Sequence, residues 1–427
     1  MQKIDFTCFS KKKKFNPITR VWIMCLFFFI SYKCQAYSVL THQALIDANW
    51  KTVLLPLLQK KYPTASPEQL KTTKAYAYGG AVAPDMGYFP YGSKLFTNLV
   101  HYVRSGDFVQ SLFDEAQNIN DYAFALGVLC HYMADTYGHP LGVNRSVPLE
   151  YPKMKKKFGS IVTYAENKIS HIRTEFSFDV LQTARGNYAS DSYHDFIGFA
   201  VADTLLGKAV LKTYGLSLNE LFVNLPLAIG TFRWAVRNVF PTITKTAWAL
   251  KRTEIEKAQP GITARKFIYS MKRKQYNAEF GNKRTKPDFF SFILSSLIQF
   301  LPKVGPLRAL NFEIPGPEVE KLFIQSFDTV SKKYTTAIKS NTASINHLPN
   351  IDYDTGKPTR FGEYPLCDKT YEELLFKLKD DCFTSITNSL KNNITNFYAV
   401  TTNAKMNSKN WRQINEALAA LKETKTN

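Results

Sequence analysis

The sequence has no apolar run of the ~18 residues that a membrane-spanning helix needs, which excludes a polytopic membrane protein. It also has no useful run of alternating apolar and polar residues, so extensive β-sheet is not expected. Cysteine is scarce, with six among 427 residues and only three beyond residue 36. Three cysteines are too few for a disulfide scaffold, so the fold must depend on an ordinary hydrophobic core. A hydrophobic share of 45% supplies that core and excludes intrinsic disorder.

Acidic residues are under-represented. The chain has 35 Asp and Glu against 55 Lys and Arg, a net charge of +20. Such a basic balance favours phosphate-bearing partners, either nucleic acid or an anionic lipid surface, and does not distinguish between them.

The N-terminal residues have the three parts of a secretory signal. Lysines 11–14 and Arg20 precede the apolar run Val21 to Tyr32, and a small-residue cleavage pattern ends at Ala36. We therefore predict a signal peptide over residues 1–36, a mature N-terminus at Tyr37, and export to the periplasm or the extracellular space. The alternative is an uncleaved anchor helix, for which this apolar run is short.

An exported protein can form disulfides. Cys367 and Cys382 could close a small loop in this way, or remain two unpaired thiols, whereas Cys130 lies in an apolar run and is expected to be buried.

Helical periodicity from Tyr37 onward predicts an all-α fold. The run Ala123 to Met133 reads as a long apolar helix, whereas the Gly-rich segment 79–87 should break the helical pattern and hold Asp85 in a rigid loop. The distribution of charged and apolar residues changes beyond about residue 216. We therefore place one region at 37–215 and a basic, mainly helical region at 216–427. No flexible linker separates them.

Histidine is rare and unevenly placed, since six of the seven lie between His42 and His194. Three ligand-type side chains at four-residue spacing share one helical face, and a pair repeats the spacing about forty residues later. Imidazole and carboxylate groups together suit zinc. The candidate ligands are His42, Asp85, His101, His131, Asp135, His139, His171 and Glu175.

Each of these residues alone has an ordinary structural explanation. A lone histidine such as His101 is usually a core residue, and a single His-x3-Asp pair can be a surface ion pair. Eight such residues within 134 positions are different, because burying them without partners would cost several kcal/mol each. The pattern therefore predicts a metal site.

The order of these motifs also resembles a known family. Tyr37-Ser-Val-Leu-Thr-His42, Ala83-Pro84-Asp85 and His131-Tyr-Met-Ala-Asp135, with His101, His139 and His171-x3-Glu175, resemble the zinc-dependent phospholipase C family over about residues 37–215. The same helical superfamily includes the fungal single-strand-specific zinc nucleases.

The resemblance implies up to three zinc ions and the cleavage of phosphodiester bonds by an activated water. It implies that Asp85 also orients or deprotonates that water. It places the ligands in three sets: Asp85, His101, His131 and Asp135; His139, His171 and Glu175; and His42, bridging Asp135 and the main-chain amine and carbonyl of Tyr37. Signal cleavage would complete the third set, because an amide nitrogen has no lone pair to offer.

Two positions depart from the family pattern. The first mature residue is typically Trp, whereas here it would be Tyr37, which main-chain ligation tolerates. Asp135 and His139 are four positions apart, where the best-known members have six, so His139 is the least secure ligand. The four-residue spacing is more similar to that of the glycosylphosphatidylinositol-specific phospholipase branch. It favours a lipid substrate over nucleic acid.

We therefore expect an exported zinc phospholipase C acting at a phospholipid surface. The alternatives are a single-strand-specific zinc nuclease and a non-catalytic lipid-surface-binding protein with structural zinc. His194 is a possible contact to substrate or to a ligand and is left out of the ligand sets.

The basic stretch 251–288 contains eleven Lys and Arg against four acids, and the apolar run Phe289 to Leu301 follows it. Residues 251–301 could dock on anionic lipid. A solvated charged loop followed by a buried helix fits equally well, and single-stranded nucleic acid could bind there by stacking on interleaved aromatic residues. The sequence decides neither the role of residues 216–427 nor the oligomeric state.

Overall fold

A computed structural model describes residues 39–185, 188, 199–234, 240–264, 312–339, 348–399 and 409–425, and these are mainly helical, as predicted. The N-terminal helices are α2 (Val39–Asn49), α3 (Leu55–Lys61), α4 (Pro67–Val82), α5 (Lys94–Tyr102), α6 (Ser105–Glu115), α7 (Ile119–Gly138), α8 (Asn144–Glu150), α9 (Pro152–Phe158) and α10 (Lys168–Arg185). They are followed by α12 (Asp203–Tyr214), α13 (Leu218–Leu221), α14 (Leu225–Trp234), α15 (Phe240–Ala258), α19 (Pro317–Lys339), α21 (Pro365–Asp380), α22 (Asn388–Ala399) and α23 (Lys409–Glu423).

Shorter elements connect these helices. Two π-helical turns, η1 (Trp50–Leu54) and η3 (His139–Val143), and a 3₁₀ turn, η2 (Ala83–Tyr88), lie in the N-terminal half. Within the described residues, strands occur only as an antiparallel pair of two residues each, β1 (Ile351–Asp352) and β2 (Lys357–Pro358). None of the described helices is both long and apolar enough to cross a bilayer.

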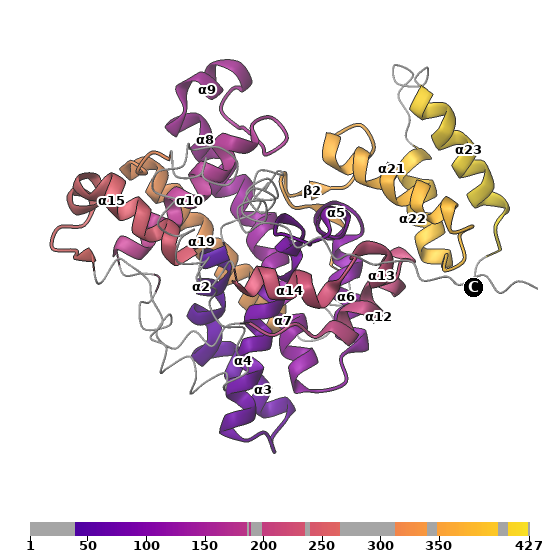
Figure 1. Cartoon of the computed structure of the whole chain (residues 1–427), viewed down its shortest axis with the longest axis horizontal. Coiled ribbons are helices and arrows are strands. Elements are labelled where there is room, and N and C mark those ends of the chain that lie inside the picture. Colours follow the sequence, from indigo (N-terminus) through magenta and orange to yellow (C-terminus); the bar gives the residue numbers. More distant parts are fainter. Residues whose placement is uncertain are drawn as a thin grey trace, which may run out of the picture.

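Helix α7 is the centre of the fold (Figure 1). It begins at the cap residue Asn118, whose side chain accepts hydrogen bonds from the main-chain N–H groups of Asn120 and Asp121. From Ala123 onward almost every side chain is buried, because α2, α4, α6 and α19 pack around it. A helix that is apolar on all sides is stable only when it is enclosed in this way.

Two glycines set the distance between α4 and α7. A Cβ atom on Gly80 would lie 2.0 Å from the Phe124 carbonyl oxygen, and one on Gly127 would lie 2.1 Å from the Ala77 carbonyl oxygen. The two backbones therefore touch directly, which brings the C-terminal end of α4 against the polar end of α7. The expected break in the helix at Gly79 and Gly80 was wrong: α4 continues to Val82, because these glycines serve close packing.

The C-terminal helices share the core of the N-terminal ones. Tyr334 of α19 is fully buried, and its hydroxyl donates a hydrogen bond to the Leu126 carbonyl oxygen of α7 (2.9 Å). One hydrophobic cluster extends from Val39 to Leu421, although α21, α22 and α23 gather on the opposite side of the view from α10 and α15 (Figure 1). The division of the chain near residue 216 stays a prediction.

The possible disulfide is absent, since Cys367 and Cys382 are both free. Cys367 is buried near the start of α21 and Cys382 follows its end. At about 1.5 Å per helical residue they are roughly 20 Å apart along the helix, whereas a disulfide needs Cα atoms within about 7 Å. Cys130 is buried, as predicted.

Several predictions concern residues outside the described ranges. These are the predicted signal peptide over residues 1–36, the predicted N-terminal ligand Tyr37, His194, and residues 265–301 of the segment 251–301 that could dock on lipid.

Candidate metal centre

The predicted face of α7 exists and is buried. The Nε2 atom of His131 lies 3.1 Å from one oxygen of Asp135, and the Nε2 atom of His139 lies 3.5 Å from the other. The four-residue spacing places these side chains on one face, although His139 already belongs to the π-helical turn η3. The four-residue spacing between Asp135 and His139 is therefore compatible with a shared site.

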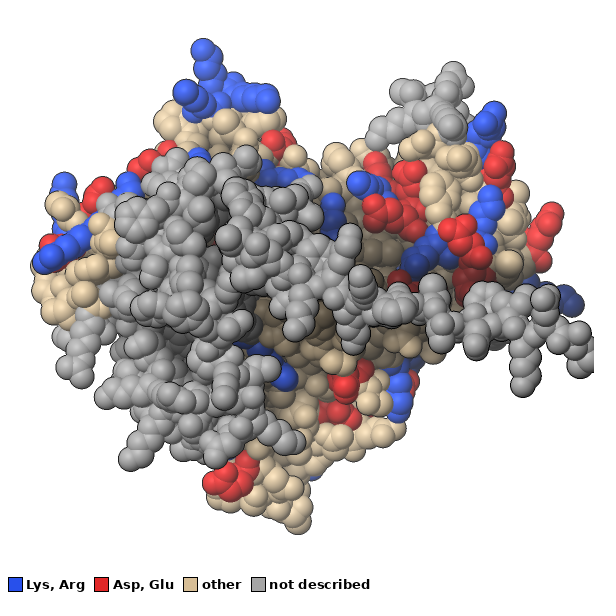
Figure 2. Space-filling view, in the orientation of Figure 1, with Lys and Arg blue, Asp and Glu red and all other residues tan. Residues whose placement is uncertain are grey.

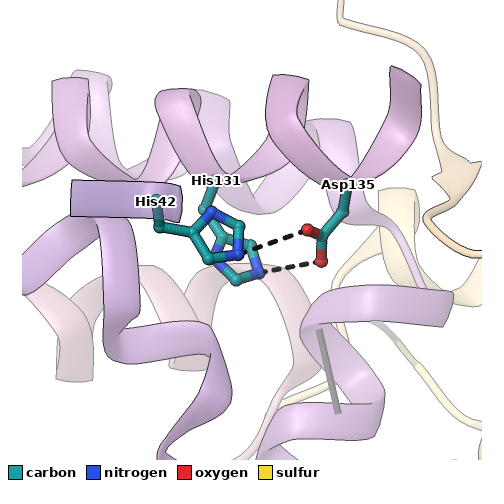
Figure 3. Close-up of side chains that lie close together, drawn as sticks. All are labelled: His42, His131 and Asp135. Atoms are coloured by element: carbon teal, nitrogen blue, oxygen red, sulfur yellow. Dashed lines mark ion pairs between the residues drawn. The ribbon is translucent and has the colours of Figure 1, made fainter. Parts of the chain in front are cut away.

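His42 comes to this face from α2 (Figure 3). Its ring stacks on that of His131, with centroids 4.2 Å apart, and its Nε2 atom lies 3.4 Å from Asp135 Oδ1. Both imidazoles therefore present a nitrogen to the same carboxylate, as the dashed lines in the close-up show.

Asp85 and His101 complete the same side of the cluster. Asp85 lies in η2, directly after α4, and His101 lies at the end of α5. The His101 Nε2 atom is 3.4 Å from Asp135 Oδ2 and 3.6 Å from Asp85 Oδ1. Asp135 is thus the common neighbour of four histidines from three helices and a turn.

The pair from α10 forms the other side. The His171 Nδ1 atom lies 3.0 Å from Glu175 Oε1, and that oxygen lies 3.9 Å from His139 Nε2. The rings of His139 and His171 stack with centroids 5.0 Å apart. All eight described residues of the predicted ligand set therefore meet in one buried cluster.

Fixed acceptors determine which nitrogen of two histidines carries the proton. The Nδ1 atoms of His101 and His131 each lie 2.8 Å from a main-chain carbonyl oxygen, of Thr97 and Ala81 respectively. A carbonyl can only accept, so each Nδ1 donates its N–H. A neutral ring then directs the bare Nε2 lone pair at carboxylate oxygens, which also offer only lone pairs. A cation between them removes this repulsion.

The carboxylates also require a cation beside them. The oxygens of Asp85 and Asp135 are buried and accept no hydrogen bond of normal geometry from the described residues. Two ligands bound tetrahedrally to one zinc ion at ~2.0–2.1 Å are about 3.3 Å apart. The nitrogen–oxygen distances around Asp135 are 3.1–3.5 Å. The cluster therefore fits zinc, with imidazole nitrogens and carboxylate oxygens at the spacing of ligands.

Burial and charge shift the pKa values of these groups. Loss of solvent lowers the pKa of His42 and His171 well below the usual value and raises the pKa of Asp85 and of Glu175. Burial opposes ionisation of Asp135 too, but its histidine neighbours, above all His131, hold its pKa well below the usual value.

Burial would also lower the pKa of His101, yet the carboxylates of Asp135 and Asp85 raise it to about 10. Without a metal, protons must supply the positive charge that the carboxylates require.

One further acid, Asp354, was missed by the sequence reasoning. It is buried in the turn between β1 and β2, with Oδ1 3.4 Å from the Nδ1 atom of His139. Three triads have ligand atoms close enough to share an ion: His42, His131 and Asp135; Asp85, His101 and His131; and His139, His171 and Asp354. The local signal was the acidic turn Asp352-Tyr353-Asp354-Thr355-Gly356, which lies far from the histidine-rich stretch.

Fold and site together define an all-α protein with a buried histidine–carboxylate centre of the kind that holds zinc. The model of the zinc-dependent phospholipase C family matches residues 41–222, which confirms the resemblance seen in the sequence motifs. The matched segment contains all eight described residues of the predicted ligand set and excludes Asp354. Comparisons of the chain with curated proteins and with solved structures gave no match.

Proposed function

We propose that this protein is a zinc-dependent phospholipase C that cleaves the glycerol-side phosphodiester bond of phospholipids. The observation that carries the proposal is the convergence of all eight described ligand-type residues on one buried cluster inside the segment that matches the family. The family match and the cluster support a zinc-dependent hydrolase. The phospholipid substrate is what the proposal adds.

The proposed ligand sets are those that the family resemblance implies, and short contacts within each set support them. One zinc would be held by Asp85, His101, His131 and Asp135, whose nitrogen and oxygen atoms are within 3.1–3.6 Å of their neighbours. A second would be held by His139, His171 and Glu175. A third would take His42 and Asp135, 3.4 Å apart, together with the main-chain amine and carbonyl of Tyr37.

Bound zinc ions would lower the pKa of a water molecule, bind phosphoryl oxygens and stabilise the leaving alkoxide. Asp85 is the residue we assign to orienting and deprotonating that water.

The third zinc depends on export. We propose that signal cleavage after Ala36 frees the amine of Tyr37 and so completes the His42 set. Protein beginning at Tyr37 should contain about one more zinc per chain than protein that keeps one extra residue before it, by elemental analysis after dialysis. Equal zinc content in the two proteins would remove the amine from the ligand list.

A phospholipid surface is the proposed partner. Of the segment 251–301, only residues up to 264 are described, so its role in docking stays a prediction. Elsewhere, the short helix α9 exposes Lys153, Lys155, Lys156 and Lys157, which form the blue cluster at the top of Figure 2. Each cation near an anionic bilayer surface gains about 1 kcal/mol.

The test uses protein beginning at Tyr37, incubated with phosphatidylcholine vesicles or single-stranded DNA, with and without a chelator. We expect diacylglycerol release that the chelator abolishes and added zinc restores, with the DNA intact. Nucleotide release without lipid cleavage would replace the proposal with the nuclease reading. Stoichiometric zinc with no turnover of either substrate would replace it with the non-catalytic, lipid-surface-binding reading.

A further inference from the structure

The turn between β1 and β2 is a rigid structure pressed against the end of α7. The Asp352 Oδ1 atom accepts hydrogen bonds from the main-chain N–H groups of Asp354 (2.9 Å) and Thr355 (3.0 Å). Gly356 has φ +67°, and a Cβ atom there would lie 2.7 Å from the carbonyl oxygen of Thr136, one residue after Asp135. Only glycine allows both this conformation and this close approach.

The same hairpin is hydrogen-bonded to α6 and to the C-terminal end of α5, which carries His101. Ser105 Oγ donates to the Ile351 carbonyl oxygen (2.6 Å) and accepts from the Ile351 N–H (2.9 Å). The main-chain N–H of Tyr353 donates to the carbonyl oxygen of His101 (3.2 Å), and its ring centroid is 5.0 Å from that of His101. The hairpin therefore has a fixed position relative to the cluster.

The Asp354 carboxylate is held on one side and directed at a ligand on the other. Oδ2 accepts hydrogen bonds from the hydroxyls of Tyr102 (2.9 Å) and Tyr364. Oδ1 lies 3.4 Å from the Nδ1 atom of His139. Two tyrosines from separate elements thus fix a buried negative charge beside one particular imidazole nitrogen.

The two nitrogens of His139 have different surroundings. Nε2 lies 3.5 Å from Asp135 and 3.9 Å from Glu175, within the cluster, whereas Nδ1 faces Asp354. A carboxylate beside Nδ1 favours the tautomer with the proton on that atom, which leaves the Nε2 lone pair directed at the metal position. Asp354 therefore sets both the orientation and the basicity of His139.

Asp354 also acts on the second histidine of this set through its main chain. Its carbonyl oxygen accepts a hydrogen bond from Asn144 Nδ2 (2.6 Å), and Asn144 Oδ1 lies 2.9 Å from His171 Nε2. The amide oxygen can only accept, so His171 donates from Nε2 and presents Nδ1 to Glu175, 3.0 Å away. One residue thereby connects to both imidazoles of the set.

We infer that Asp354 is a positioning residue for the zinc held by His139, His171 and Glu175, so that the C-terminal region completes this part of the site. The inference rests on the proposed zinc centre. It goes beyond the family resemblance, because Asp354 lies outside the matched residues 41–222.

The experiment compares zinc binding by the full mature chain and by Asp354→Asn, which keeps the shape of the side chain and removes its charge. Metal-free protein is titrated with zinc against a chromophoric chelator. We expect the affinity for one zinc to fall about 10–100-fold and the others to change less than threefold. At saturating cobalt the visible absorption spectrum should match the wild type, because no ligand has been lost.

Two further variants separate position from general effects. Asp352→Asn replaces the other buried carboxyl group of the same hairpin but keeps an oxygen for the turn N–H groups, so its zinc affinities should match the wild type. Tyr364→Phe keeps the Asp354 charge and removes one hydroxyl donor, so a loss smaller than that of Asp354→Asn is expected. This variant also tests the inference if Asp354→Asn does not fold.

Each result decides one question. Unchanged zinc affinities in folded Asp354→Asn would overturn the positioning role while leaving the zinc centre intact. A changed cobalt spectrum at saturation would overturn it too, by showing that Asp354 is itself a ligand. A wild-type chain that binds no zinc would instead overturn the proposed function on which the inference rests.

Discussion

Replacing Asp135 with Ala should lower kcat/KM by at least ~1,000-fold, equivalent to about 4 kcal/mol of transition-state stabilisation. The reason is its position: Oδ1 faces the Nε2 atoms of His42 and His139, and Oδ2 faces those of His101 and His131, all at 3.1–3.5 Å. Its removal takes an oxygen ligand from two proposed zinc sets at once. Bound zinc, counted by elemental analysis, should therefore fall together with phospholipid hydrolysis.

The matched control is Asp121→Asn on the same helix. Asp121 lies in the first turn of α7, where its carboxylate accepts a hydrogen bond from Asn118, about 20 Å along the helix from Asp135. This variant should retain zinc and activity. If Asp135→Ala retained full zinc and a kcat/KM within twofold of the wild type, the cluster would not be the catalytic centre.

Removal of the metal should lower the melting temperature by ~10 °C. The cluster buries imidazoles beside ionisable carboxylates, and uncompensated buried charge costs several kcal/mol. A ligand that binds only the folded state stabilises it by about 4 kcal/mol at 1,000 times its Kd, so three zinc ions would contribute about 12 kcal/mol. With an unfolding entropy of ~2.1 cal/mol/K per residue, each kcal/mol shifts the melting temperature of a chain of ~400 residues by roughly 1 °C. Differential scanning calorimetry before and after dialysis against a chelator measures the shift.

Addition of zinc should restore the original melting temperature, and magnesium should not. The Asp135→Ala variant provides the control, because its melting temperature should respond weakly to the chelator. A wild-type melting temperature that stays constant while elemental analysis shows complete loss of zinc would mean that the fold does not depend on the metal.

Much of the site was predictable from local spacing. His131, Asp135 and His139 share a face because the helical period places residues four apart on one side, and no distant contact is needed for that. The all-α class followed from periodicity in the same way. The four-residue step to His139 also proved compatible with the cluster, since η3 continues the helical direction beyond α7.

Other features required the packed structure. Segment 79–87 reads as a turn because glycine disfavours helices, yet α4 runs through Gly79 and Gly80 because another backbone approaches them closely. The two cysteines of the possible disulfide have a suitable sequence separation, but helix α21 holds them apart.

The sequence by itself determined the helical class, the candidate ligand residues and their grouping along the chain, because these depend on neighbours within a few residues. The tertiary structure alone decided that His42 stacks on His131, that Asp135 is common to four imidazoles, and that Asp354 lies beside His139. These contacts join segments up to 215 positions apart. They depend on how whole helices and a hairpin pack against α7, and no local pattern specifies that.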